Sequence, residues 1–203
     1  MGPRVILVGG SSNAGKSTVA ACLAARLGWA HVSTDSLARH PGRPWRPNPM
    51  EVPPHVAEHY LGLTDDELLA SVLGHYRNMW PLVEELVRRH AGDASTERLV
   101  LEGSALWPEL VAALTAPQVS AVWLTADESV FETRILRGSG YDEADDRGRA
   151  MIAKFLERTR RFDRAMREDL ARLGLPQVEV GDGISPDEVA NLCLAAMTPV
   201  SVS

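Results

Sequence analysis

The chain has 203 residues, of which 45% are hydrophobic and 24% charged, and its formal net charge is −6. This length fits one domain, or a core with one insertion, and the composition excludes a disordered chain, which would hold fewer apolar residues. The acidic balance argues against a general nucleic-acid binder, and no uninterrupted apolar stretch reaches the about 18 residues that a membrane span requires.

The two cysteines, Cys22 and Cys193, are too few for a disulfide framework and lack the spacing of metal ligands. The N-terminus leads directly into an apolar run and glycines, without the pattern of a signal peptide. We therefore expect a cytoplasmic protein without nucleic-acid or membrane partners. The sequence leaves a homodimer open.

Short apolar runs alternate with longer amphipathic stretches along the chain. Runs without a polar break are typical of strands buried on both faces, as in a parallel sheet. This alternation predicts an α/β domain on a five-stranded parallel sheet. We expect strands at 4–8, 30–33, 99–101, 119–125 and 178–180, and helices through 19–27, 127–137, 149–173 and from 186 onward. The first three helices are expected to end at Gly28, Gly138 and Gly174.

Residues about 40–96 interrupt this alternation and are predicted to be an insertion between the second and third strands. Six prolines between Pro41 and Pro54 indicate an irregular loop. Two helices are expected after it, at about 64–73 and 76–90, and Thr64 with Glu67 forms the pattern of a capping box. The whole chain, residues 1–203, is expected to be one domain that contains this insertion.

The strongest signal is a glycine-rich segment between the first strand and the first helix. It fits the pattern G-x4-G-K-[ST], in which glycines let successive backbone amides point at an anion and the helix N-terminus attracts negative charge. The chain has only two lysines, and one of them, Lys16, stands in this loop. The alternative is a turn that binds nothing. The expected nucleotide contacts are Gly10, Ser11, Ser12, Asn13, Ala14, Gly15, Lys16, Ser17, Thr18 and Arg134.

Two acidic residues follow expected strands, where the carboxyl ends line the ligand crevice of an α/β sheet. If the loop binds a nucleotide whose phosphoryl group is transferred, the second substrate, called the acceptor, offers a hydroxyl. Asp35 is placed to accept the proton of that hydroxyl, or instead to cap the next helix. Glu102 is placed to hold Mg²⁺ together with Ser17, or to contact the acceptor. Its alternative is a surface glutamate at a strand end.

A lid is expected at about 137–160. Arg134 and Arg137 precede the flexible stretch 138–140, so that closure would bring arginines to the phosphates, and Arg137 is assigned a catalytic role. Arg158, Arg160 and Arg161 are further candidates. For these the alternative is a solvated face with ion pairs four residues apart, as the spacing of Glu157 and Arg161 suggests.

The acceptor is expected to contact the insertion. A basic patch follows Asp35 and suits an anionic substrate, although a merely solvated loop is the equal alternative. Met79 and Trp80 are interpreted as core residues, and the histidines show no spacing of zinc ligands. The candidate substrate contacts are Asp35, Arg39, Arg43, Arg46, Arg77 and Glu102, with His40 in the same patch.

With these residues the sequence resembles P-loop small-molecule kinases of the nucleoside-monophosphate-kinase fold, a three-layer sandwich. Residues 32–37 and 101–108 are similar to elements of 2-phosphoglycerate kinases, and the loop resembles that of chloramphenicol phosphotransferase. The resemblance covers about two thirds of the chain and leaves 40–96 unmatched. It implies ATP and Mg²⁺ as cofactors, Asp35 as base, Lys16 and Ser17 as phosphate and metal ligands, and Arg137 as a lid residue.

The expected activity is therefore transfer of the γ-phosphoryl group of ATP to a hydroxyl of a small molecule. The acceptor classes considered are phosphorylated metabolites such as 2-phosphoglycerate, sugars and antibiotic-like compounds. Two alternatives remain open at this point. One is a regulatory or switch NTPase without an acceptor, and the other is a zeta-toxin-like kinase acting on a peptidoglycan precursor.

Overall fold

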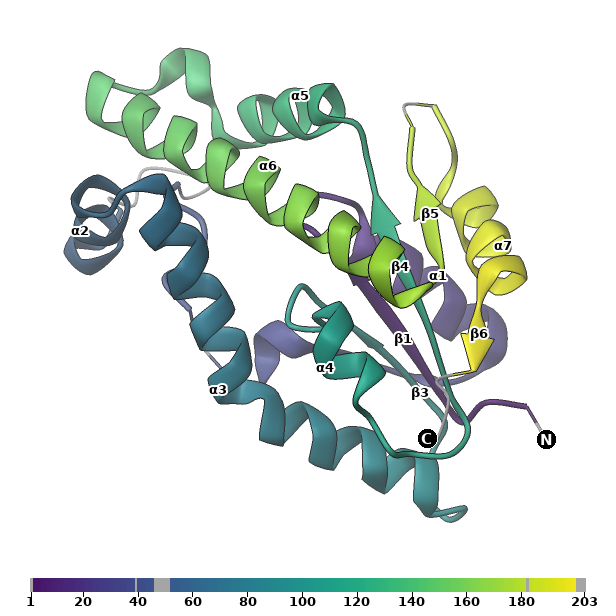
Figure 1. Ribbon diagram of the computed structural model, residues 1–203. Coiled ribbons are helices and arrows are strands. Elements are labelled where there is room, and N and C mark those ends of the chain that lie inside the picture. Colours follow the sequence, from purple (N-terminus) through teal and green to yellow (C-terminus); the bar gives the residue numbers. More distant parts are fainter. Residues whose placement is uncertain (1, 39, 46–51, 182, 200–203) are drawn as a thin grey trace.

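A computed structural model describes residues 2–38, 40–45, 52–181 and 183–199 (Figure 1). Its centre is a parallel sheet with the strand order β2-β3-β1-β4-β5, which confirms the five expected strands. A sixth, two-residue strand that the sequence did not indicate, β6 (Thr198–Pro199), pairs antiparallel with β4. The strands are β1 (Val5–Gly10), β2 (Ala30–Ser33), β3 (Leu99–Glu102), β4 (Val119–Thr125) and β5 (Gln177–Glu179).

Helices cover both faces of the sheet and give the expected three layers. Ile6 and Val8 of β1 belong to a core with α1 (Lys16–Leu27) and α7 (Pro186–Ala196). Val5 and Leu7, which point to the opposite face, pack with α3 (Asp65–Gly92), α4 (Pro108–Ala112) and the second half of α6 (Asp146–Leu173). Figure 1 shows α3 and α6 diverging on the side of the sheet opposite α7. Because β1, β3 and β4 are buried on both faces, their sequences are mainly apolar, with Glu102, Ser120 and Thr125 as buried exceptions.

The insertion folds differently from its prediction. The two helices expected at 64–73 and 76–90 are one helix, α3 (Asp65–Gly92), which continues through Gly74 and Pro81 because a buried apolar stripe runs along its whole length. The capping box of Thr64 and Glu67 is confirmed. A further helix, α2 (Pro54–Gly62), begins at the last proline of the stretch that was interpreted as loop.

The expected lid region consists of the end of α5 (Glu128–Ser139), the short 3₁₀ turn η2 (Tyr141–Glu143) and the first half of α6. Helix α5 passes through Gly138, where it was expected to end, and stops at Gly140 with φ 64°. Gly28 and Gly174 end their helices as predicted, both with left-handed backbone. Among the helices of the described residues, none has the length and hydropathy to cross a bilayer.

Candidate functional site

The loop between β1 and α1 is curled by residues with positive φ. Gly10 has φ 140°, Asn13 has 63° and Gly15, which precedes the first turn of α1, has 93°. A Cβ on Gly10 would lie 2.5 Å from the carbonyl oxygen of Leu124 in β4, so no larger residue fits there. The loop therefore presents backbone amides at the N-terminus of α1, the arrangement that binds phosphate.

Lys16 lies at the mouth of this loop. Its side chain is buried, and its Nζ donates a hydrogen bond of 2.6 Å to the Ser11 carbonyl. Burial lowers the pKa of Lys16, and the carboxylates of Glu102 and Asp35 act in the opposite direction. An ammonium held close to loop amides, in a partly dry position, is suited to a polyphosphate.

A hydrogen bond to α6, which the sequence did not predict, holds the loop in place. The buried hydroxyl of Ser11 donates a 2.7 Å hydrogen bond to Oδ1 of Asp163 in α6. Oδ2 of the same carboxylate accepts from Nε of Arg167 at 2.7 Å, and Arg167 also donates to the Ala126 carbonyl. The Ser11 side chain thus fixes the loop to α6, and the nucleotide contact expected of Ser11 stays a prediction.

Ser17 and Glu102 lie together, as expected for a shared metal site. The Ser17 hydroxyl donates a 3.0 Å hydrogen bond to Oε1 of Glu102, which is 3% exposed. Glu102 is therefore not a surface glutamate. A hydroxyl and a carboxylate beside a phosphate loop form an all-oxygen donor set, which fits Mg²⁺.

Asp35 follows β2 in the 3₁₀ turn η1 (Thr34–Ser36) and lines the same cavity. The capping alternative does not hold, because Ser33 caps this turn by accepting from the Asp35 amide. Gly103 allows the turn to approach the end of β3 closely. Its φ is 154°, and any Cβ there would overlap the Thr34 side chain. Glycine at this position lets the turn that carries Asp35 pack against the strand end that carries Glu102.

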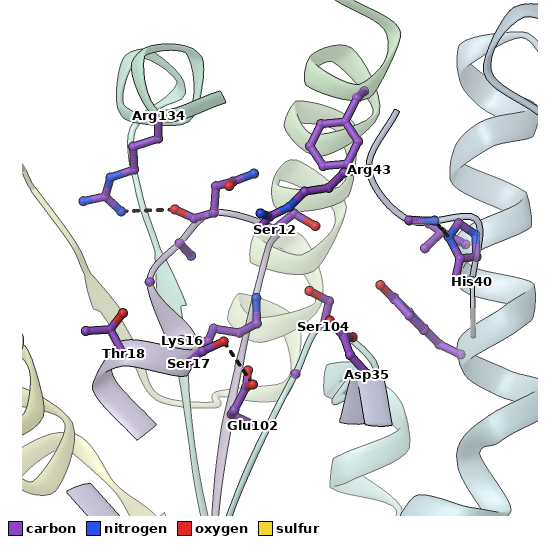
Figure 2. A pocket seen from close by; sticks show the side chains of 18 of the residues that line it. Ser12, Lys16, Ser17, Thr18, Asp35, His40, Arg43, Glu102, Ser104 and Arg134 are labelled. Carbon is purple, nitrogen blue, oxygen red and sulfur yellow. Dashed lines mark hydrogen bonds between the residues drawn. The ribbon is translucent and has the colours of Figure 1, made fainter. Parts of the chain in front are cut away.

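One cavity of about 1050 Å³ joins these groups and extends into the insertion. Figure 2 shows Thr18 and Arg134 on one side of Lys16, and Asp35, Ser104 and His40 on the other. The end beside Arg134, where the nucleotide contacts are expected, is called here the nucleotide end. The lining of the cavity also includes apolar residues of the β5–α7 region, among them Val180, Ile184 and Val189. The opposite end, called here the acceptor end, is lined by His40, Arg43, His55, His75, Tyr76 and Arg158.

The arginines of the lid region fall into two groups. Arg134 lines the cavity and donates a 3.1 Å hydrogen bond to the Asn13 carbonyl, in keeping with its predicted nucleotide contact. Arg137 is exposed on α5 and is not among the lining residues, and its catalytic role stays a prediction. Arg160 pairs with Glu132 at 2.7 Å and Arg161 with Glu157 at 2.8 Å, so the ion-pair alternative holds for both.

The predicted acceptor contacts are only partly brought together. Arg43 lines the cavity, whereas Arg77 is exposed on α3 and lies outside the lining. Arg39 and Arg46 lie outside the described residues. Ser104 and Tyr76 also line the cavity and were not predicted, although Ser104 directly follows the Glu-Gly pair at the end of β3. Burial raises the pKa of Tyr76 to about 12, so this phenol stays protonated in the cavity.

Known proteins match this chain only through their structures. No family model matches the sequence, and a search of curated proteins finds no match. A gluconokinase from Sinorhizobium meliloti 1021 is 23% identical with a TM-score of 0.55, over 96% of this chain and 91% of that chain. A shikimate kinase from Aquifex aeolicus vf5 is 15% identical with a TM-score of 0.51, over 95% of each chain.

The chain has a P-loop NTPase fold. At these identities the likeness establishes the fold alone, and that fold is shared with kinases of small molecules. The narrower resemblance to 2-phosphoglycerate kinases and chloramphenicol phosphotransferase stays a prediction.

Proposed function

We propose that the protein is an ATP- and Mg²⁺-dependent kinase that phosphorylates a hydroxyl group of a small molecule. The observation that carries this proposal is the single cavity in which Lys16 lies between a nucleotide end and an acceptor end. A switch NTPase needs the loop but no second compartment. Here the cavity continues past Asp35 to the helices of the insertion, which leaves room for an acceptor beside the γ-phosphate.

In this mechanism the loop amides and Lys16 bind the β- and γ-phosphates, and Arg134 covers them from the side of α5. Ser17 and Glu102 hold Mg²⁺, which when bound neutralises phosphate charge. Asp35 orients the acceptor hydroxyl and takes its proton as the oxygen attacks the γ-phosphorus, so that ADP leaves with the former bridging oxygen. Most of the expected catalysis is positioning and electrostatic stabilisation.

The test is a screen for acceptor-dependent ADP release with phosphorylated metabolites, sugars, nucleosides and antibiotics, followed by mass spectrometry of the product. We expect at least one compound to raise the rate of ADP release and to gain one phosphoryl group. A slow rate of ADP release that no compound changes would favour the switch NTPase instead. A folded protein that takes up neither ATP nor GTP in calorimetry with Mg²⁺ present would refute nucleotide binding altogether.

The zeta-toxin-like alternative shares this core and differs in the acceptor. It is tested by adding nucleotide-sugar precursors of peptidoglycan to the same screen and by following growth when the protein is expressed. Growth arrest that depends on Lys16, together with phosphorylation of the precursor, would select this alternative over a metabolic acceptor.

A further inference from the structure

Arg158 of α6 is a buried cation without a counterion. It is 6% exposed and lines the cavity, yet within residues 2–38, 40–45, 52–181 and 183–199 no carboxylate forms an ion pair with it. Its neighbours on the same helix, Arg160, Arg161 and Arg164, all pair with acidic residues. Since buried charges are normally paired, the cavity places a positive charge where a ligand can supply the negative one.

The guanidinium is held in a fixed orientation. Its Nη1 donates a 2.8 Å hydrogen bond to the hydroxyl of Tyr60, which in turn donates to the Gly42 carbonyl. Its central carbon lies 4.6 Å from the centre of the Phe155 ring, so that one face of the group is covered. Among the described residues Tyr60 is the one hydrogen-bond acceptor of this side chain, although a guanidinium has five N–H groups. The remaining donors are preorganised for a planar or tetrahedral anion.

Three histidines surround this position. The ring of His40 lies 5.1 Å from that of His75 and 5.5 Å from that of His59, measured between centroids. Burial, Arg158 and the two other imidazoles lower the pKa of His40 to about 3, so His40 is neutral at pH 7. His40 therefore adds no charge, but it adds a hydrogen-bond donor. Since Nδ1 of His40 accepts from the Gly42 amide, its proton is on Nε2, which is buried and has no partner among the described residues.

We propose that the acceptor carries an anionic group, a carboxylate or a phosphate monoester, in addition to the hydroxyl that is phosphorylated, and that Arg158 binds this group beside the histidines. This inference rests on the proposed kinase function. The acceptor is favoured over the γ-phosphate as the bound anion because the contacts of Arg158 come from Tyr60 of the insertion. The nucleotide end has its own arginine, Arg134, tied to the loop at Asn13.

The experiment separates the two anion sites by filling the nucleotide end first. The protein is saturated with Mg²⁺ and AMP-PNP, a non-hydrolysable ATP analogue that occupies the γ-phosphate position. Inorganic phosphate and acetate are then titrated separately, and binding is followed by calorimetry in two buffers of different ionisation heat. Phosphate probes an acceptor that is a phosphate ester, and acetate probes one that is a carboxylic acid. We expect one of them to bind, and the two buffers separate the heat of binding from the heat of any proton exchange.

Variants test whether the guanidinium of Arg158 binds the anion. Arg158→Gln should weaken binding of the anion by about tenfold to a hundredfold, as expected for loss of a charged hydrogen bond, while the affinity for AMP-PNP stays unchanged. Arg158→Lys should retain part of the affinity. Tyr60→Phe, which removes the hydroxyl that orients Arg158, should cost less than Arg158→Gln. Arg164→Gln, an exposed position on the same helix, is the matched control.

The outcomes distinguish this inference from the proposed function. If AMP-PNP does not bind, the kinase proposal fails. If AMP-PNP binds, two results overturn only the inference about the acceptor: neither anion binds, or every anion that binds wild type binds Arg158→Gln equally well. The same holds if Arg158→Gln weakens AMP-PNP and leaves the anion affinity unchanged, because Arg158 would then belong to the nucleotide end. In the acceptor screen we expect hydroxy acids or phosphate esters to exceed the matching neutral polyols.

Discussion

In the proposed kinase, the two ends of the cavity bind their ligands through different parts of the chain. At the nucleotide end the main ligands are backbone amides of a short loop, with Lys16 beside them, all within one strand-turn-helix unit. At the acceptor end the ligands are side chains from the 40–45 segment, α3 and α6, held by contacts between segments far apart in the sequence. Backbone amides suit any polyphosphate, whereas side chains define which molecule enters. The first end accounts for a reaction shared by many proteins, and the second for the choice of substrate.

The largest expected effect comes from removing the charge at the nucleotide end. Lys16→Ala should lower acceptor-dependent ADP release by about 10³-fold, because the γ-phosphate loses its closest cation in a dry site. Circular dichroism and thermal unfolding should show an intact fold, and phosphate binding at the acceptor end should persist. Lys154→Ala is the matched control, since the only other lysine of the chain lies on α6 and donates to the Leu63 carbonyl. Turnover like that of wild type in Lys16→Ala would refute the loop assignment.

Asp35 stands between the two ends, and its replacement should separate binding from transfer. Asp35→Asn should keep the affinity for ATP and lower phosphoryl transfer by about 10²-fold, the usual contribution of a positioned base. Calorimetry gives the first quantity and single-turnover product formation the second. Asp127→Asn, an exposed carboxylate before α5, serves as control. Transfer that survives in Asp35→Asn would mean that another group takes the proton.

A smaller change tests the metal site. Glu102→Gln keeps the shape of the side chain but removes its charge, so the Mg²⁺ concentration that gives half-maximal ADP release should rise about tenfold. Binding of ATP measured without Mg²⁺ should not weaken. An unchanged Mg²⁺ dependence would place the metal away from Glu102 and leave this residue as a buried partner of Ser17.

The smallest effect concerns stability and reports on the acceptor end alone. The pKa of His40 is lowered from 6.5 to about 3, where it faces Arg158 of α6, His59 of α2 and His75 of α3. Between these values the unfolded chain binds the proton and the folded chain does not, so stability is complete above pH 6.5 and falls as the pH falls. Wild type should lose about 1 kcal/mol more than His40→Asn between pH 7 and 5.5.

Chemical denaturation at the two pH values measures this difference in the free energy of unfolding. Asn at position 40 can still accept the Gly42 amide, which keeps the turn. His31→Asn, at an exposed position on β2, should show the pH dependence of wild type. Equal losses in wild type and His40→Asn would mean that the imidazole is solvated rather than held neutral.

The nucleotide end could be predicted from the sequence better than the acceptor end. The loop, Asp35 and Glu102 could be predicted as site residues because each is marked by a local pattern next to a strand. The hydrogen bonds of Ser11 to Asp163 and of Arg158 to Tyr60 join residues 152 and 98 positions apart, and no local pattern marks them. Arg158 in particular looks like its neighbours Arg160 and Arg161 in the sequence, and only the packing of α2 against α6 distinguishes it.

The fold was predicted more completely than the insertion. Continuous apolar runs identify the strands because burial on both faces leaves no room for polar side chains. Helix α3 was divided in two because Gly74 disfavours a helix locally, whereas the buried stripe on either side of it stabilises one continuous helix. Helix α2 was missed because its prolines dominate the local signal, although Pro54 occupies the first helical turn, where proline is tolerated.

Helix α6 carries both Asp163, which fixes the phosphate loop, and Arg158, little more than one turn away. Both residues belong to one uninterrupted helix of 28 residues, so a tilt of this helix would move both side chains. A small displacement of the phosphate loop when a nucleotide binds would therefore also shift the guanidinium of Arg158. Such coupling is reciprocal: if bound triphosphate changes the affinity for the second substrate by some factor, the second substrate changes the affinity for the triphosphate by the same factor.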